Sequence, residues 1–219
     1  SAASDVYKRQ MYDIGVALTK LFFTLFGQWK VEGKELVPPH GPLILVCNHQ
    51  SNADGPALCA SMPRRVQTMA KRSLFSNKLL SWILRSWGVY PVDTGRRSAK
   101  TIAWALETLG GGGVLAVFPE STRSPHRMRK AMHGAAYLAA RTGAMIVPVG
   151  ITGTENIPGF WRIAFPLSRI SVKIGEPFRI SQVTEALQSS ALETMTTEIM
   201  QHVAALLPED YRGVYSPGI

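Results

Sequence analysis

The 219-residue chain has few cysteines, few acidic residues and no apolar run long enough to cross a bilayer. Its two cysteines, Cys47 and Cys59, exclude a disulfide framework and a zinc-knuckle spacing, and they favour a reducing compartment. The 14 prolines and 19 glycines do not recur periodically, and 46% of the residues are hydrophobic, which excludes collagen-like and disordered chains. We expect one compact domain with a large apolar core.

The scarcity of acidic residues is uneven. The whole chain has 24 basic and 15 acidic residues, a formal net charge of +9. The segment from Arg64 to Arg141 contains fourteen basic residues and only three acidic ones, Asp93, Glu107 and Glu120. This segment therefore carries more than the whole excess of positive charge. Such a concentration indicates an anionic partner.

The N-terminal residues divide into two parts. Residues 1–10 are polar and unpatterned, and we interpret them as a cloning or sequence-assembly remnant outside the fold. Residues 11–29 predict an amphipathic helix that we expect to associate with a membrane, although an ordinary core helix has the same periodicity. Lys20 at the centre of this segment argues against a bilayer span. The segment also has no basic leader or small-residue cleavage site, which argues against a signal peptide. The residues that share the apolar face are Ile14, Leu18, Leu21, Phe22, Leu25 and Phe26.

Residues 30–219 alternate between short apolar runs and helical patterns. The alternation predicts a single α/β domain with a mostly parallel or mixed central sheet flanked by helices. The strands are expected at 43–47, 66–70, 114–118, 145–151 and 170–174, and the helices at 56–61, 73–87, 99–109, 131–142 and 183–207.

Polar residues that follow predicted strands are the first candidates for chemistry, because ligands of open α/β sheets bind at the carboxyl ends of the strands. After the strand at 43–47 come Asn48 and His49, with Asp54 five residues beyond the histidine. A histidine serves as a general base, and a carboxylate on its other ring nitrogen fixes its tautomer. The chain has no Gly-x-Ser-x-Gly elbow, which favours direct activation of a substrate hydroxyl over a covalent enzyme intermediate.

Three further segments have a related pattern. Phe-Pro-Glu-Ser-Thr-Arg-Ser follows the strand at 114–118 and supplies a guanidinium suited to phosphate at Arg123, together with Glu120 and Thr122. Arg96 and Arg97 precede a predicted helix whose free N–H groups also favour an anion. In Ile-Val-Pro-Val-Gly-Ile, Pro148 predicts an edge strand or a bulge.

Taken together, these four segments resemble the motifs of the glycerolipid acyltransferase family, of the 1-acylglycerol-3-phosphate acyltransferase (lysophosphatidic acid acyltransferase) type. Asn48, His49 and Asp54 match its Asn-His-x-x-x-x-Asp motif, and residues 118–124 match Phe-Pro-Glu-Gly-Thr-Arg-Ser except that Ser121 replaces the glycine. The second block fits loosely, since Thr94 and Gly95 separate Asp93 from Arg96, and residues 147–149 supply the fourth, Val-Pro-Val.

The resemblance implies transfer of a fatty acyl group from acyl-CoA or acyl carrier protein to 1-acylglycerol 3-phosphate, forming phosphatidate, with no cofactor or metal. It makes His49 the general base and Asp54 its orienting partner. The remaining implied residues bind substrate: Arg123, Arg96, Arg97 and Lys71 hold the phosphate, and Glu120, Thr122 and Asn48 complete the site. Serine at position 121 either incurs a backbone cost, if the family glycine has a positive φ, or narrows the acceptor site.

Two alternatives remain open. The same chemistry serves another acceptor, such as glycerol 3-phosphate, another lysophospholipid or an acylated amino acid. A non-enzymatic module that binds anionic lipid or nucleic acid also accounts for the basic segment. Basic and aromatic residues interleave over 71–87, and Phe160, Trp161 and Phe165 make 157–167 unusually apolar. We therefore expect a monotopic or peripheral protein on the cytoplasmic face of the cell membrane, with no nucleic-acid partner.

Overall fold

The computed structural model describes residues 2–93, 98–157, 159–182 and 188–216. They form a mixed seven-stranded sheet in the order β1-β7-β6-β2-β5-β3-β4, in which the β6–β7 pair is antiparallel and the other pairs are parallel. This confirms the α/β prediction. The strands are β1 (Gln28–Glu32), β2 (Leu43–Cys47), β3 (Val66–Lys71), β4 (Val89–Val92), β5 (Val114–Val117), β6 (Met145–Thr152) and β7 (Arg169–Ile174).

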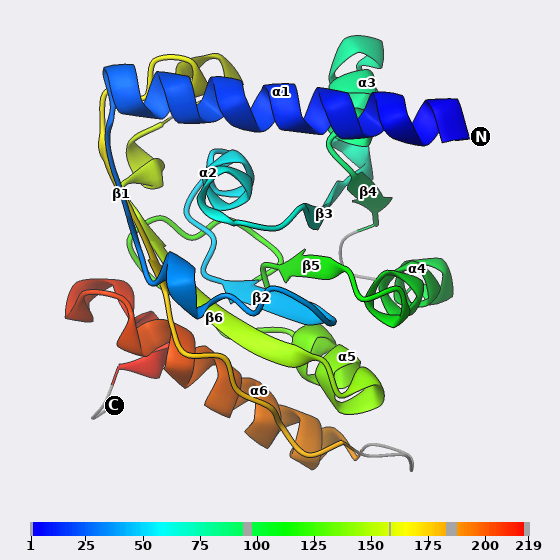
Figure 1. Cartoon of the computed structure of the whole chain (residues 1–219). Helices are drawn as coiled ribbons and strands as arrows, with labels where there is room; N and C mark the ends of the chain where they lie inside the picture. Colours follow the sequence, from blue (N-terminus) through cyan, green and yellow to red (C-terminus); the bar gives the residue numbers. More distant parts are fainter. Residues whose placement is uncertain (1, 94–97, 158, 183–187, 217–219) are drawn as a thin grey trace.

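Helices cover both faces of the sheet (Figure 1). The helices α1 (Ala2–Phe26) and α2 (Asp54–Ser61) pack on one face, and α4 (Ala99–Gly110), α5 (Gly134–Thr142) and α6 (Ser189–Ala205) pack on the other. Helix α3 (Lys78–Ser86) contacts α1. Short 3-10 helices lie at Lys34–Leu36, Arg72–Phe75, Thr154–Asn156, Phe160–Ile163, Glu209–Tyr211 and Gly213–Tyr215.

The central strand β2 explains the two-layered core. All five of its side chains are fully buried, and they alternate between the two helical layers as period-2 geometry requires. Ile44 and Val46 face α4, α5 and α6, whereas Leu43, Leu45 and Cys47 face α1 and α2. Such burial on both faces gives the continuous apolar run from which the strand was predicted.

The N-terminal helix differs from its prediction at both ends. Helix α1 begins at Ala2, so residues 2–10, which were expected to lie outside the fold, are helical, and the Lys8 carbonyl accepts a hydrogen bond from Arg65. It ends at Phe26, because the chain turns into strand β1 at Gln28. The origin of the first ten residues stays a prediction.

Other helix boundaries also differ from their predictions. The helix expected over 73–87 is divided, because the Asn77 side chain accepts a hydrogen bond from Leu80 N (3.0 Å) and caps a new helix, α3. Helix α6 begins at Ser189, and the expected helical residues 183–187 lie outside the described chain.

Pro148 is not on an edge strand as one of its two interpretations required, because β6 lies between β7 and β2. The β6–β7 ladder starts at Val149, opposite Ile174, and the next bridge joins Ile146 to Phe178, so the neighbouring chain has one extra residue opposite Pro148. The Pro148 carbonyl still accepts a hydrogen bond from Gly175 N at 2.9 Å. The missing N–H therefore falls in a bulge of the pairing, which confirms the other interpretation.

Strands β6, β2, β5, β3 and β4 are parallel neighbours, so their carboxyl ends share one edge of the sheet. In spatial order this edge presents the residues that follow each strand. These are Thr154 after β6, His49 after β2, Glu120 to Arg123 after β5, Lys71 at the end of β3, and Asp93 after β4.

Candidate active site

His49 and Asp54 form a hydrogen-bonded pair at the end of β2. The turn at 48–53 brings His49 Nδ1 within 2.7 Å of Asp54 Oδ2, the carboxylate of the first residue of α2. Asp54 is fully buried, whereas 23% of the His49 side chain is exposed. The His49 ring packs on Phe118, with ring centroids 4.6 Å apart, so its orientation is fixed from two sides.

Asp54 accepts three further hydrogen bonds. Oδ2 accepts from the backbone N–H groups of Gln50 (2.6 Å) and Ser51 (2.9 Å), and Oδ1 accepts from the Thr154 hydroxyl (2.5 Å). An ionised carboxylate satisfies all of these donors as an acceptor, so the shared proton lies on His49 Nδ1. His49 Nε2 then carries the lone pair that a general base requires.

Asn48 follows β2 as expected, and its side chain is hydrogen-bonded to the protein backbone. Its side-chain N–H donates to the Ile151 carbonyl and its oxygen accepts from Ile151 N, both at 2.8 Å, so the amide extends the β2–β6 ladder by one residue. The side chain is fully buried. Asn48 therefore fixes the turn that carries His49, and its expected role as a substrate contact stays a prediction.

Glu120 is also occupied by the protein. Oε1 accepts from His49 N (2.9 Å) and Oε2 accepts from Arg129 N (2.8 Å), and only 4% of the residue is exposed. Burial raises the pKa of this carboxyl above its ordinary value, although the two amide hydrogen bonds act in the opposite direction. Glu120 thus joins the turn that carries His49 to the loop after β5, and its expected role in substrate binding stays a prediction.

The loop after β5, which carries Arg123, is hydrogen-bonded to the turn that carries His49. Ser124 N donates to the His49 carbonyl at 2.8 Å, and His126 N donates to Gln50 Oε1 at 2.7 Å. Arg123 is exposed and Thr122 is half-buried, so both remain available to a ligand. Ser121 has a φ of 56°, which shows that the first of the two effects expected of serine at this position applies.

The structure places only part of the expected phosphate site. Lys71 is exposed at the end of β3, two strands from β2, which corresponds to about 10 Å along the edge. Arg96 and Arg97 lie outside the described residues. Asp93, just before them, pairs with Arg72 at 2.8 Å, so that carboxylate is turned toward a neighbouring cation.

Sequence reasoning missed Gln50 and Thr154. The available signal for Thr154 was its position, since Thr-Gly-Thr-Glu directly follows the predicted strand at 145–151 and so reaches the same edge as His49. In the described part of the chain, no three His, Cys, Asp or Glu side chains gather closely enough to hold a metal ion.

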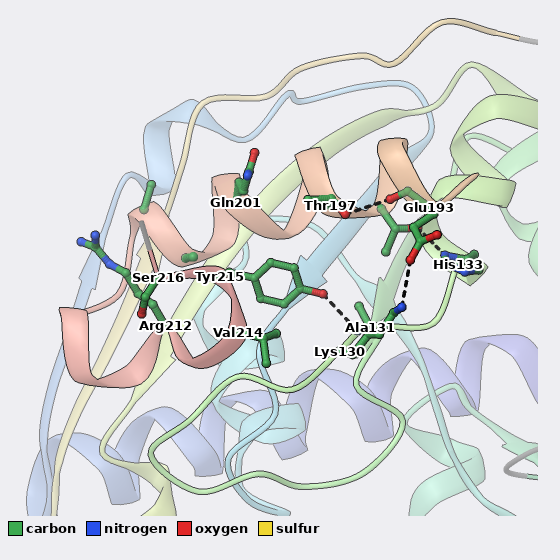
Figure 2. Close-up of a pocket in the computed structure, with 13 residues that line it drawn as sticks. Lys130, Ala131, His133, Glu193, Thr197, Gln201, Arg212, Val214, Tyr215 and Ser216 are labelled. Carbon is green, nitrogen blue, oxygen red and sulfur yellow. Dashed lines mark hydrogen bonds and ion pairs between the residues drawn. The ribbon is translucent and has the colours of Figure 1, made fainter. Parts of the chain in front are cut away.

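A cavity of about 640 Å³ lies elsewhere, between α6, residues 130–133 and residues 212–216 (Figure 2). Among the residues expected at the active site, none of those that the structure describes lines it. The Tyr215 hydroxyl accepts a hydrogen bond from Ala131 N at 3.0 Å, and Lys130 pairs with Glu193 at 2.8 Å. These contacts hold Lys130 and Ala131, which follow the loop that carries Arg123, against α6 and the C-terminal residues.

The chain is similar to several known proteins. A family model described as Acyltransferase matches residues 28–152. The 1-acyl-sn-glycerol-3-phosphate acyltransferase of Bacillus subtilis (strain 168) is 26% identical over 197 residues, which cover 90% of this chain and 96% of that protein. The protein of the same name from Streptococcus pneumoniae (strain ATCC BAA-255 / R6) is 28% identical, over 71% of this chain and 57% of that protein.

A solved structure is similar over nearly the whole chain. The crystal structure of the 1-acyl-sn-glycerophosphate (LPA) acyltransferase PlsC from Thermotoga maritima matches with a TM-score of 0.67 at 25% sequence identity. The match covers 91% of this chain and 78% of that chain.

Proposed function

Because the chain belongs to the acyltransferase family, we propose that it moves a fatty acyl group from a thioester to the free hydroxyl of 1-acylglycerol 3-phosphate, forming phosphatidate for phospholipid synthesis. The observation that carries the proposal is the His49–Asp54 pair, whose free Nε2 shares one sheet edge with the exposed Arg123. Proteins that are named for this reaction match most of the chain, which supports the choice of acceptor.

The chemistry follows from the site. As the acceptor hydroxyl oxygen attacks the thioester carbonyl carbon, His49 Nε2 takes the hydroxyl proton, and Asp54 stabilises the imidazolium that forms. The tetrahedral intermediate then collapses, the C–S bond breaks, and the thiolate of coenzyme A or acyl carrier protein receives the proton from His49. An ester and a free thiol are the products.

The two cysteines are unsuited to carry the acyl group. Cys47 and Cys59 are buried, and burial raises the pKa of Cys47 well above its ordinary value and that of Cys59 to about 11. A thiol with a raised pKa that does not reach solvent is a poor nucleophile. This supports direct transfer from donor to acceptor over a covalent enzyme intermediate.

The acceptor phosphate needs fixed cations close to His49. Arg123 meets this need, because its neighbour Ser124 is hydrogen-bonded to the His49 backbone. We assign Lys71, Arg96 and Arg97 to the same phosphate, and Thr122 to the glycerol. Holding the phosphate brings the free hydroxyl within reach of Nε2 and lowers the entropic part of the barrier.

An exposed apolar surface supports a membrane-associated enzyme. The apolar face expected on α1 points outward, since Ile14, Leu18, Leu21 and Leu25 are exposed, whereas the core contacts of α1 lie on a different line that includes Tyr12 and Phe23. In the described residues, no helix combines the length and the apolarity that a bilayer span requires.

Helix α3 extends this surface. Figure 1 shows α3 beside α1, and Leu79, Trp82 and Ile83 of α3 are exposed next to Lys78 and Arg85. Trp161 and Phe165 continue it at the other end of α1, where the rings of Phe26 and Phe165 lie 4.8 Å apart. Apolar and basic residues together suit an anionic lipid surface. We place this surface on the cytoplasmic leaflet, a reducing side consistent with two free cysteines.

Binding to vesicles tests the membrane proposal. The double variant Lys78→Glu/Arg85→Glu is expected to lose about tenfold or more in affinity for vesicles of mixed phosphatidylglycerol and phosphatidylcholine at low salt, since each basic residue near such a surface contributes about 1 kcal/mol. The matched control, Lys100→Glu/Lys173→Glu, makes the same change of charge away from the surface. Equal binding by both variants would contradict the proposal.

A panel of acceptors tests the reaction. Thiol release from acyl-CoA is measured in detergent with 1-acylglycerol 3-phosphate, glycerol 3-phosphate, another lysophospholipid and an acylated amino acid. We expect the first to give the highest kcat/KM, and Arg123→Glu to lower that value by raising KM for the phosphate-bearing acceptor. Preference for an acceptor without phosphate contradicts the assignment of Arg123. If none of the acceptors in the panel causes thiol release, the chain is not shown to be an enzyme and the non-enzymatic binding module remains the alternative.

A further inference from the structure

The turn after β6 reaches into the active site from a part of the chain that shares no motif with His49. Strand β6 ends at Thr152, and Gly153 follows with a φ of 86°. A Cβ atom at this glycine would lie 1.7 Å from the Arg169 carbonyl oxygen, so no larger residue fits. This turn directs the Thr154 side chain inward, where it is fully buried and donates to Asp54 Oδ1 at 2.5 Å.

Thr154 differs from the other three donors to Asp54. His49 Nδ1, Gln50 N and Ser51 N belong to the same turn and all contact Oδ2. Thr154 is 100 residues away in the sequence and donates to Oδ1. A carboxylate held at one oxygen still tilts about its terminal bond, which has a broad torsional minimum, whereas a donor on the second oxygen fixes its plane.

We propose that Thr154 is a positioning residue for acyl transfer, whose hydroxyl fixes the plane of the Asp54 carboxylate so that Oδ2 stays on His49 Nδ1. It contacts no substrate. It acts through Asp54, which in turn keeps His49 in the tautomer that leaves Nε2 free. The inference rests on the proposed function for its kinetic consequence, but the arrangement of the hydrogen bonds is testable without turnover.

The turn itself does not depend on the Thr154 hydroxyl. Ile157 N donates to the Thr154 carbonyl at 2.9 Å, and Ser168 Oγ donates to the Gly153 carbonyl at 2.6 Å. The next side chain, Glu155, accepts from the Tyr211 hydroxyl at 2.7 Å. Thr154→Val replaces the hydroxyl by a methyl group of similar size, so the turn is expected to fold and the variant to report on the hydrogen bond.

The kinetic experiment compares four proteins in the thiol-release assay with 1-acylglycerol 3-phosphate. Hydrogen bonds to charged groups predict a fall of about ten- to a hundredfold in the kcat of Thr154→Val, with KM unchanged for both substrates. Thr154→Ser keeps the hydroxyl and is expected to stay within about threefold of the wild type. The control, Thr196→Val, removes another buried hydroxyl, one that donates to the Leu192 carbonyl in α6, and should leave kcat unchanged.

The spectroscopic experiment follows the His49 Nδ1 proton by ¹H–¹⁵N NMR. In the wild type, in Thr154→Ser and in Thr196→Val, this proton is expected as a low-field imidazole resonance protected from exchange. In Thr154→Val it should broaden or disappear at the same pH and temperature, because the carboxylate no longer holds a fixed plane.

The outcomes separate the two proposals. A wild type that forms no phosphatidate but shows the protected resonance, lost only in Thr154→Val, contradicts the proposed reaction and supports the positioning role. An active wild type with equal kcat and an unchanged resonance in Thr154→Val overturns the positioning role alone. A fall in kcat shared by Thr154→Val and Thr154→Ser also overturns it, because the hydroxyl is then not the group that matters.

Discussion

Replacement of Asp54 by asparagine separates the charge of the catalytic pair from its geometry. An amide with its oxygen at the position of Oδ2 still accepts from His49 Nδ1, Gln50 N and Ser51 N. Its NH₂ group then lies at the position of Oδ1 and donates to the Thr154 hydroxyl, which also accepts hydrogen bonds. The reverse orientation sets N–H groups against N–H groups, so the first is strongly preferred and the His49 tautomer is retained.

The charge is the main loss in Asp54→Asn, and its size follows from the short separation. A carboxylate and an imidazolium whose charge centres are about 4 Å apart attract by about 4 kcal/mol at an effective dielectric constant of 20. If the full positive charge develops on His49 in the transition state, kcat falls by up to about 10³-fold. Asp54→Ala, in contrast, leaves the buried backbone N–H groups of Gln50 and Ser51 without an acceptor, at about 1–3 kcal/mol of folding stability each.

The assay is thiol release at saturating concentrations of both substrates, together with thermal unfolding of the same protein samples. Asp54→Asn should melt close to the wild type while its kcat falls by two to three orders of magnitude. A kcat within about threefold of the wild type would refute the stabilising role of the Asp54 charge. A variant that no longer folds would refute the hydrogen-bond arrangement from which the prediction is derived.

Three further variants test other parts of the structure. Ser121→Gly removes the strain of a φ of 56° but makes the unfolded chain more flexible. Its free energy of unfolding should therefore be unchanged or up to about 1 kcal/mol higher than that of the wild type. A clearly lower free energy of unfolding in urea contradicts this. Burial raises the pKa of Glu120 above 4.5 in the folded state, so the folded protein binds its proton more tightly than the unfolded chain. The stability of the wild type relative to Glu120→Gln should therefore fall as the pH rises from about 4.5 through the raised pKa, and a difference independent of pH excludes this. In Tyr12→Phe, Val66 N loses its acceptor in the core, with an expected cost of about 1–3 kcal/mol that an unchanged denaturation midpoint would rule out.

The sequence predicted the central sheet better than its edges. Strands β2 and β5 are fully or nearly fully buried, and a short continuous apolar run between turn residues is typical of such a strand. Strands β1 and β4 lie at the two ends of the sheet and have mixed patterns, which periodicity does not distinguish from loops.

The candidate site shows the same limit. The pair of His49 and Asp54 was accessible from its spacing, because both residues lie in one turn. The contact between Asp54 and Thr154 was not, because it joins positions 100 residues apart. Asn48 and Glu120 have side chains that suit a substrate, and only the structure shows that backbone groups occupy them.

The most direct test of the central claim is the rate of phosphatidate formation from 1-acylglycerol 3-phosphate and acyl-CoA by the wild type and by His49→Ala. With His49 as the general base, removal of the imidazole should lower the rate by about 10²–10⁴-fold, with the fold intact by circular dichroism. Equal rates in the two proteins would contradict the account, because the hydroxyl would then lose its proton without His49.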